Sequence, residues 1–363
     1  MTAERFDERA GPAAAGHDGA ADSPIRVGIS ACLLGEKVRF DGGHKRDSFL
    51  TDVLGRFVEF VPVCPEVDAG FGTPREAMRL ARVDGSIRLV TVKTDRDVTA
   101  PMERLVRRRV PSLEAEQLSG YVLKKNSPSC GLQRVKVYDR NGVPSASGRG
   151  VFAEALVQRY PQLPVEEEGR LSDPRLRENF VERVFAYNRL RTLFRGTWTL
   201  GALVAFHTAH KLILMSHSPV GYRRLGRLVA SARARRRADV RQQYGDEFMQ
   251  TMGALATCRK HTNVLQHMAG YFKNRLDRES KVELQQTIED YRRGLIPLIV
   301  PITILQHHVR VHGVEYLAGQ LYLQPHPKEL MLRITRSGTG LGRPRPHGRV
   351  LGVCEDLRQG ASE

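Results

Sequence analysis

The sequence predicts two domains: an α/β domain with an open sheet over residues 25–172, followed by a mainly α-helical domain over residues 173–330. In the first stretch, short apolar runs alternate with amphipathic segments, which is the pattern of strands separated by helices. In the second stretch, apolar residues recur every three to four positions over long segments, which indicates helices. A chain of 363 residues is also too long for one ordinary hydrophobic core.

The first domain is expected to alternate strands with helices. Its strand candidates are residues 27–29, 58–63, 87–92, 121–123 and 135–137, and its helical candidates are residues 48–57, 100–119 and 150–160. The segment that follows, residues 161–174, combines prolines with three consecutive glutamates, which is typical of a linker.

The second domain is expected to consist of helices separated by turns. The candidates are residues 176–194, 199–215, 222–244, 246–272, 278–293 and 302–311. Residues 1–24 are expected to form a disordered leader, and residues 331–363 a basic, glycine-rich, mobile tail.

The composition is that of a globular protein with a large excess of positive charge. Lys and Arg number 57 against 40 Asp and Glu, which gives a formal net charge of +17. Such an excess indicates a polyanionic partner, with nucleic acid the first expectation and an anionic membrane surface the second.

The cysteine content and the apolar runs indicate the cellular compartment in which the protein is expected. Five scattered cysteines, an odd number, are not typical of a secreted disulfide framework. The N-terminus has neither the basic nor the apolar region of a signal peptide, and the longest apolar run, residues 294–305, is interrupted by Pro297 and Pro301. We therefore expect a cytoplasmic protein without a membrane span, and no obligate protein partner is indicated.

Three cysteines occupy unusual positions, each at or beyond the end of a short apolar run. Cys32 and Cys64 follow the first two strand candidates, and Cys130 lies in a Ser-Pro-Ser-Cys-Gly loop after residues 121–123. Hydroxyls, lysines and backbone N–H groups near Cys130 are surroundings that favour a thiolate. In an open α/β sheet the carboxyl ends of the strands line the ligand-binding crevice, so the three thiols are expected to converge. The turn-rich loop 38–44 is expected to wall the same crevice.

Three thiols that converge could form more than one kind of site. Their spacing does not match a zinc finger, but it suits an iron–sulfur cluster held by three thiolates with one metal position open. A cysteine nucleophile and ordinary buried thiols are the alternatives. Glu66 lies two residues after Cys64, so in an extended segment its carboxylate points the same way as the thiol, unless it is a solvated loop residue. Ser127 and Ser129 are either site residues or ordinary turn residues.

Three motifs of the first domain resemble one known family. Residues 29–35 (ISACLLG), 63–66 (VCPE) and 125–131 (KNSPSCG) are similar to the signature of the 2-thiouracil desulfidases, and the resemblance covers about residues 25–172. All three motifs are intact.

This resemblance implies an iron–sulfur enzyme. In that family three cysteines bind a 4Fe-4S cluster whose fourth iron is free of protein ligands, and a Glu and a Ser of these motifs act on the substrate. It therefore implies Glu66 as the acid/base and Ser127 as a polar catalytic partner. The implied cluster ligands are Cys32, Cys64 and Cys130. Substrate contacts are expected from Ser30, Asp41 and Ser129.

The second domain resembles the YbgA-type domain at residues 210–219, 261–273 and 294–301. The two-domain arrangement is similar to the tRNA 4-thiouridine desulfidases. Independently of that resemblance, arginines crowd the helical candidate at 222–244, with no acid over residues 222–238, which favours phosphate binding over an ordinary solvated face. The predicted RNA contacts are Arg223, Arg224, Arg227, Arg233, Arg235, Arg236, Arg237 and Lys273.

Other residues of the second half have less defined roles. Tyr271 is expected to pack in the helical core, with stacking on an unpaired base as the alternative. Cys258 and His261 lie one helical turn apart and could hold half of a metal site, but Cys258 is better interpreted as a small buried hydrophobic residue. Cys354, in the tail, is given no role.

The predicted function is hydrolytic removal of sulfur from 4-thiouridine in tRNA, which leaves uridine. In this hypothesis the thiocarbonyl sulfur binds the open iron, Glu66 transfers the proton, and the target nucleotide is unstacked so that its base reaches the crevice. The alternatives are a desulfidase of free thiolated bases such as 2-thiouracil, and a non-catalytic iron–sulfur protein that binds nucleic acid. The net charge of +17 favours the RNA substrate, since a small neutral base needs no such field.

Overall fold

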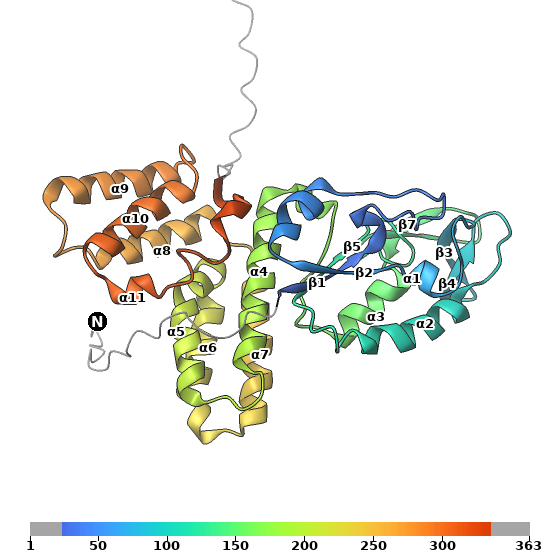
Figure 1. Ribbon diagram of the computed structural model, residues 1–363, viewed down its shortest axis with the longest axis horizontal. Coiled ribbons are helices and arrows are strands. Elements are labelled where there is room, and N and C mark those ends of the chain that lie inside the picture. The colour runs from blue at the N-terminus through green and yellow to red at the C-terminus, as the bar shows by residue number, and fades with distance from the viewer. Residues whose placement is uncertain (1–23, 335–363) are drawn as a thin grey trace, which may run out of the picture.

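A computed structural model describes residues 24–334 of the chain. It contains an α/β domain followed by a helical domain, which confirms the predicted fold class (Figure 1). The predicted leader up to residue 23 and the predicted tail beyond residue 334, including Cys354, lie outside the described residues.

The first sheet carries the strand ends that the sequence analysis singled out. Its order is β2-β1-β5-β8, and all neighbouring strands are parallel. Ser30 pairs with Val63, so the segments after β1 and β2 leave the sheet at the same edge. The strands are β1 (Arg26–Ser30), β2 (Glu59–Val63), β5 (Gly120–Leu123) and β8 (Val165–Glu167).

The strand β8 lies in the segment that was predicted to be a linker. Tyr121, Val122 and Leu123 of β5 pair with residues 165–167, which places that segment inside the fold. The three consecutive glutamates are all less than one-tenth exposed. The linker prediction is therefore wrong, because each carboxylate has a partner. Glu166 pairs with Arg170 at 2.7 Å, and the partners of Glu167 and Glu168 are described below.

A second, mixed sheet completes the α/β domain, which thus holds two sheets rather than one. Its order is β4-β3-β6-β7, with β3 parallel to β6 and antiparallel to β4. Strands β3 and β7 were not predicted, because the alternation in MRLARV of β3 changes phase at Leu80 and Ala81, and PSASG of β7 has no large apolar residue. The strands are β3 (Met78–Val83), β4 (Ser86–Thr91), β6 (Val135–Tyr138) and β7 (Pro144–Gly148).

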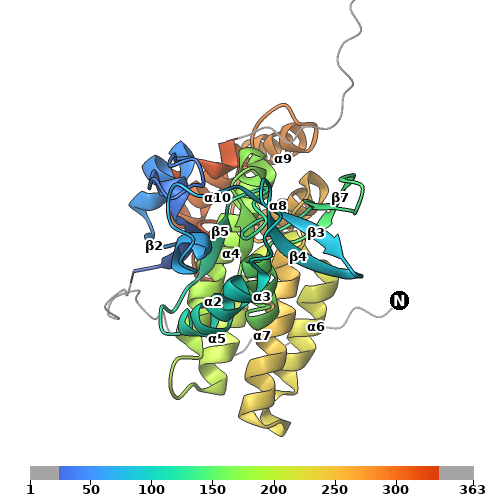
Figure 2. The ribbon, with the colours of Figure 1, turned by 90° about the vertical axis from the view of Figure 1, so that its right-hand side faces the viewer.

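The helices of the first domain are α1 (Pro65–Asp68), α2 (Thr99–Ser112) and α3 (Val151–Arg159). Helices α2 and α3 pack against each other beside the sheets (Figure 2). Tyr121 of β5 and Phe152 of α3 bring their ring centroids within 5.9 Å in the core. The predicted helix at 48–57 is instead a π-helical turn, Phe49–Val53, followed by a 3-10 turn, Leu54–Arg56.

The second domain is built from helices only, within the described residues. Side-chain oxygens of Asp173, Thr199, Ser218, Thr257 and Asp277 accept backbone N–H groups at helix starts, which stabilises those ends. The helices are α4 (Pro174–Leu193), α5 (Leu200–His217), α6 (Pro219–Ala230), α7 (Arg237–Gly253), α8 (Cys258–Gly270), α9 (Arg278–Arg292), α10 (Ile299–Val311) and α11 (Glu315–Ala318).

Two of the predicted helices are interrupted. The 222–244 candidate is split between α6 and α7 by a 3-10 turn, Ala232–Ala234, and by extended backbone at Arg235 and Arg236. The 246–272 candidate is split between α7 and α8, where the side chain of Thr257 caps the start of α8. The arginines of 222–244 therefore do not share one helix.

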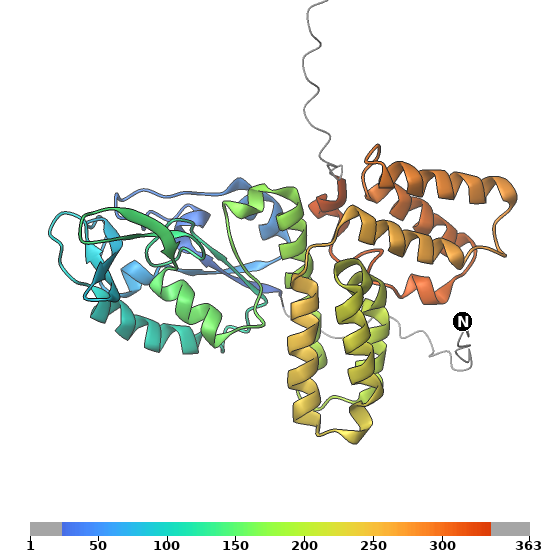
Figure 3. The same cartoon turned by 180° about the vertical axis from the view of Figure 1, so that it is seen from behind.

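Helix α4 lies between the two domains and belongs to both (Figures 1 and 3). Phe180, Val181 and Val184 of α4 pack in one core with Val27 and Ile29 of β1. The predicted boundary at residue 173 therefore cuts a shared core.

The end of the described chain also belongs to this core. Leu330 and Leu332 pack in it, and the side chain of Arg333 is 5% exposed and donates to Oε1 of Glu182 at 2.6 Å. Residues 331–334 are thus part of the fold, although they were predicted to begin a mobile tail. Among residues 24–334, no helix combines the length and apolar character that a membrane span requires.

Candidate active site

A cavity of about 350 Å³ opens at the carboxyl edge of the first sheet. The three predicted ligand cysteines line it together with Glu66, Ser127 and Ser30. Val38, Arg39 and Phe40 line it too, so the loop after the first cysteine walls the crevice as expected. Residues from three separate parts of the chain thus meet at one site.

The three cysteines lie in different local structures beyond the ends of their strands. Cys32 lies in a 3-10 turn (Ala31–Leu34) directly after β1, and its carbonyl accepts the N–H of Lys45 at 2.9 Å. Cys64 follows β2 and forms the N-terminal cap of α1. Cys130 lies in the loop between β5 and β6. All three are free thiols.

Burial keeps these thiols uncharged in the absence of a cation. It raises the pKa of Cys32 to about 11, and it also raises the pKa of Cys64 and Cys130. For Cys32 and Cys130, repulsion between the neighbouring sulfurs adds to this effect. A positively charged metal centre reverses that balance, because it stabilises the thiolates that ligate it.

The donor set fits a cluster better than a single ion. Within residues 24–334, no three His, Cys, Asp or Glu side chains lie close enough to share one metal ion. In an iron–sulfur cluster each thiolate binds a different iron, so the sulfurs surround a volume instead of a point. Three soft thiols around one cavity meet that requirement.

The Cys130 loop is held by the hydroxyl of Ser127. Its Oγ accepts the N–H of Ser129 at 3.2 Å and of Cys130 at 3.1 Å, and its carbonyl accepts the N–H of Gly131 at 2.8 Å. The same Oγ lies 3.4 Å from Oε1 of Glu66, to which it donates. Ser127 is therefore a turn residue and a site residue at once, so the two interpretations are compatible.

Glu66 is fixed by an arginine that the sequence analysis missed. Nε of Arg75 donates to Oε2 of Glu66 at 2.9 Å, and its Nη2 contacts the same oxygen. Arg75 is only 6% exposed and also donates to the carbonyls of Val38 and Gly72, at 3.0 and 2.8 Å. Glu66 is therefore not a solvated loop residue. Its segment is the first turn of α1 and not extended, so the reason given for its direction was wrong although the side chain does line the cavity.

Glu167 of β8 and Glu168, which follows the strand, hold the two ends of the Cys130 loop. Oε2 of Glu168 accepts the N–H of Lys125 at 2.7 Å, and its other oxygen contacts the ammonium of Lys124. Oε1 of Glu167 accepts the N–H of Leu132 at 2.7 Å. A run of acids that looked like solvated linker therefore positions the third cysteine.

Of the three predicted substrate contacts, the structure places one in the lining of the cavity and two outside that lining. Ser30 lines the cavity, and its Oγ accepts the N–H of Lys124 at 3.0 Å. Asp41 is exposed, pairs with Arg39 at 3.3 Å and does not line the cavity. Ser129 is fully buried beside the cavity wall and does not line it either. Only Ser30 is placed to contact a ligand there.

Comparisons with known proteins identify the family of each domain. Residues 27–168 match the 2-thiouracil desulfurase family, and residues 211–327 match a family described as a protein of unknown function, DUF1722. Over 160 residues the chain is 33% identical to the uncharacterized protein YbgA of Escherichia coli, a match that covers 44% of this chain and 95% of YbgA. The chain belongs to the 2-thiouracil desulfurase family, with a second domain of the DUF1722 or YbgA type.

Two further relatives match a part of the chain. The uncharacterized protein YbbK of Bacillus subtilis is 30% identical over 149 residues, which is 39% of this chain and 95% of YbbK. The solved structure of a [4Fe-4S]-dependent thiouracil desulfidase, TudS, is 33% identical and covers 41% of this chain and 94% of that chain, with a TM-score of 0.34. The family match over residues 27–168 confirms the resemblance seen in the motifs.

Four of the seven predicted arginines between Arg223 and Arg237 lie at the turn between α6 and α7, and the other three lie in α6. All seven predicted contacts between Arg223 and Arg237 are exposed, but they divide between α6, the turn and the start of α7. Arg224 lies 3.7 Å from Glu247, and Arg237 stacks over Trp198 at 4.9 Å from the ring centroid. Lys273 is exposed beyond the end of α8, apart from this turn. The structure therefore supports a basic turn and not a basic helix.

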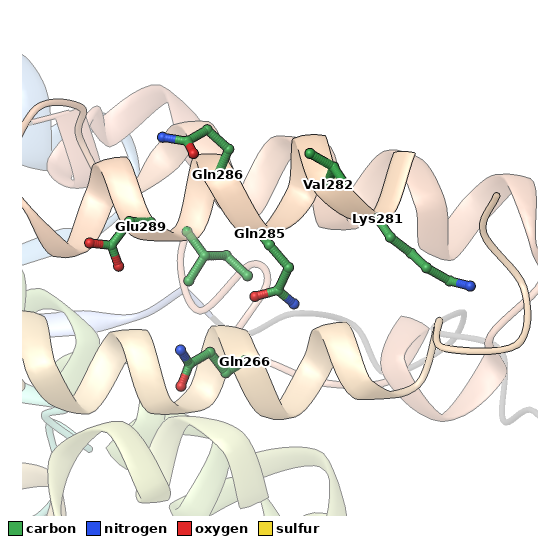
Figure 4. A pocket seen from close by; sticks show the side chains of 7 residues that line it. Gln266, Lys281, Val282, Gln285, Gln286 and Glu289 are labelled. Atoms are coloured by element: carbon green, nitrogen blue, oxygen red, sulfur yellow. The ribbon is translucent and has the colours of Figure 1, made fainter. Parts of the chain in front are cut away.

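Other candidates of the second domain take structural roles. His261 bonds its Nδ1 to the hydroxyl of Tyr322 at 2.9 Å, and Cys258 donates to the carbonyl of Tyr291 at 3.5 Å, so the two side chains do not converge on a metal. Tyr271 is 36% exposed, which contradicts its predicted place in the core. A second hollow, of about 470 Å³, lies between α8 and α9, where Figure 4 shows Gln266 opposite Gln285. Its lining has no thiol.

Proposed function

We propose that the protein is an iron–sulfur desulfidase that removes sulfur from 4-thiouridine in tRNA. The observation that carries this proposal is the convergence of three thiols and the Glu66–Ser127 pair on one cavity. The overall reaction is hydrolysis, in which water replaces sulfur at carbon 4 of the ring. Uridine and hydrogen sulfide are formed with no net oxidation or reduction.

The cofactor of this reaction is a 4Fe-4S cluster held by Cys32, Cys64 and Cys130. When bound, the cluster supplies a Lewis acid with affinity for a thiocarbonyl sulfur. Its support is the fit of three thiols, two buried and one partly buried, around one cavity in a domain of the 2-thiouracil desulfurase family. At about 350 Å³, the cavity lies in the range of small-molecule sites.

Glu66 performs the proton transfer in this proposal. Arg75 occupies its Oε2, which leaves Oε1 directed to Ser127 and the cavity. The carboxylate accepts a proton from the attacking water and returns it to the departing sulfur. Ser127 holds the carboxylate on one side and the Cys130 loop on the other, so a single hydroxyl aligns the proton carrier with the third thiol.

The choice of tRNA rests on charge. The chain carries a formal net charge of +17, and the exposed arginines around the α6–α7 turn concentrate part of it on one end of the second domain. A phosphate backbone matches such a surface, whereas a free uncharged base does not need it.

The test is anaerobic reconstitution followed by incubation with tRNA that contains 4-thiouridine. We expect bound iron and sulfide, loss of 4-thiouridine, and equal amounts of uridine and released sulfide, measured by nucleoside chromatography and a sulfide assay. A protein that binds iron but leaves tRNA unchanged and converts free 2-thiouracil would favour the second candidate, a desulfidase of free thiolated bases. The description of the family favours that candidate, since it names 2-thiouracil.

A further inference from the structure

A group of aromatic and cationic side chains lies on the second domain, away from the desulfurase cavity. It is centred on Lys211 of α5, and its members come from α5, α6, α8, the end of α8 and α11. We call it the Lys211 patch. Its members are His207, Lys211, Tyr222, His267, Tyr271 and Tyr316.

Lys211 is a half-buried cation without a compensating acid. Its Nζ lies 5.7 Å from the centroid of the Tyr316 ring, and the described residues give the ammonium no hydrogen bond or ion pair. Burial lowers the pKa of Lys211, and burial together with the charge of Lys211 lowers the pKa of His207 to about 4 and also lowers the pKa of His267. At neutral pH the two histidines are therefore neutral, and one positive charge remains to attract an anion.

The aromatic members form two stacked pairs of rings. The rings of Tyr271 and Tyr316 stack with centroids 5.3 Å apart at 17°, and His267 meets Tyr271 edge-on at 5.7 Å. The rings of His207 and Tyr222 are also parallel, with centroids 5.8 Å apart. Tyr271 stays 36% exposed, which is unusual for an aromatic side chain that only closes a core.

An anion-binding ammonium beside an exposed tyrosine face matches the two parts of a nucleotide. Phosphate oxygens bind an ammonium, and an unpaired base stacks on an aromatic ring. We infer that the Lys211 patch binds an unpaired nucleotide of the RNA substrate, with its phosphate at Lys211 and its base on Tyr271.

The position of the patch indicates a large ligand. The helices that carry it lie on one side of α4, and the strands that carry the cavity lie on the other (Figures 1 and 3). A ligand that engages both at once has to be a folded polynucleotide and not a mononucleotide. This inference rests on the proposed function, because it takes tRNA to be the substrate.

The test compares matched variants of the full chain carrying its cluster, with Lys281 of α9, an exposed lysine outside the patch, as the control. We expect Lys211→Met to weaken tRNA binding on the order of 10-fold and to reduce the slope of log affinity against log salt by about 0.7. Tyr271→Ala is expected to weaken binding on the order of 10-fold without a change of slope, and Tyr271→Phe to keep most of the affinity. Lys281→Met is expected to change neither quantity.

The outcomes separate this inference from the proposed function. If the unaltered protein binds and desulfurates tRNA while Lys211→Met and Tyr271→Ala bind it equally well, the patch is not a nucleotide site and the proposed function stands. If Tyr271→Phe loses as much tRNA affinity as Tyr271→Ala, stacking on the ring is refuted. If Lys281→Met loses as much affinity as Lys211→Met, a specific role for the charge of Lys211 is refuted. If the unaltered protein does not bind tRNA, both fail. Turnover of free 4-thiouridine is expected to be equal in all variants, and a loss there with Lys211→Met would refute a role confined to RNA binding.

Discussion

Glu167 offers the sharpest test of how β8 positions the third cysteine. Its Oε1 accepts the N–H of Leu132 at 2.7 Å and that of Gln133 at 3.3 Å. Glu167 and Leu132 are 6% and 7% exposed, whereas Gln133 is exposed and can bond to water instead. Glu167→Ala therefore removes one hydrogen bond that water cannot replace, and a bond to a charged acceptor contributes about 1.5–3 kcal/mol.

We expect Glu167→Ala to lower the free energy of unfolding by about 1.5–3 kcal/mol, measured by urea denaturation of the reduced, cluster-free protein and followed by circular dichroism. Leu132 lies two residues after Cys130, so the released loop is also expected to reduce the iron bound after reconstitution. Glu167→Gln keeps an oxygen acceptor but loses its charge, and we expect it to lose about half as much stability.

The matched control is Glu114→Ala. Glu114 pairs with Arg159 at 3.2 Å, and both side chains are more than half exposed, so its removal is expected to cost less than about 0.5 kcal/mol. Iron binding is expected to stay complete in this control. If Glu167→Ala is as stable as Glu114→Ala and binds as much iron, the carboxylates of β8 do not hold the Cys130 loop.

Three further predictions concern the ligands, the proton carrier and the basic turn. Replacing Cys32, Cys64 or Cys130 singly by Ala is expected to abolish iron binding and activity, while Cys258→Ala leaves both; full iron in all three single variants would contradict the ligand set. Glu66→Gln keeps the shape of the site and the cluster but is expected to lower kcat on the order of 100-fold, and unchanged turnover would leave Glu66 only a structural partner of Arg75. Changing Arg233, Arg235, Arg236 and Arg237 together to Gln is expected to weaken tRNA binding and reduce its salt dependence by about 0.7–0.9 per phosphate contact, with turnover of free 4-thiouridine unchanged. An equal loss on both substrates would point to unfolding of the domain.

The cysteine site could be predicted because its assembly follows from local rules. Short apolar strands that end just before Cys32 and Cys64 become neighbours when they pair in parallel, and their ends then meet at one edge. Arg75 could not be found in this way. It reaches Glu66 from a loop without periodicity, and only the tertiary fold shows that its guanidinium is almost fully buried.

The predicted helix at 222–244 was wrong for a similar reason: tertiary contacts interrupt it. Residues 227–244 contain neither glycine nor proline, so helical periodicity continues through the point where the chain reverses. The reversal is supported by contacts with another part of the chain: Arg237 over Trp198, and Arg241 over Phe194 at 6.0 Å. Cation–π contacts of this kind leave no local pattern in the arginine run itself.

Helix α4 determines which experiments can separate catalysis from RNA binding. Phe180 and Val184 complete the core of the first domain, while Leu190 and Phe194 at the other end of the helix pack in the core of the second. Ending the chain at residue 172 would expose the apolar face of β1, and the lost activity would then report the stability of the sheet instead of substrate recognition. Point substitutions at the α6–α7 turn and in the Lys211 patch leave that shared core intact. They can therefore assign RNA recognition to the second domain, which removing the domain cannot do.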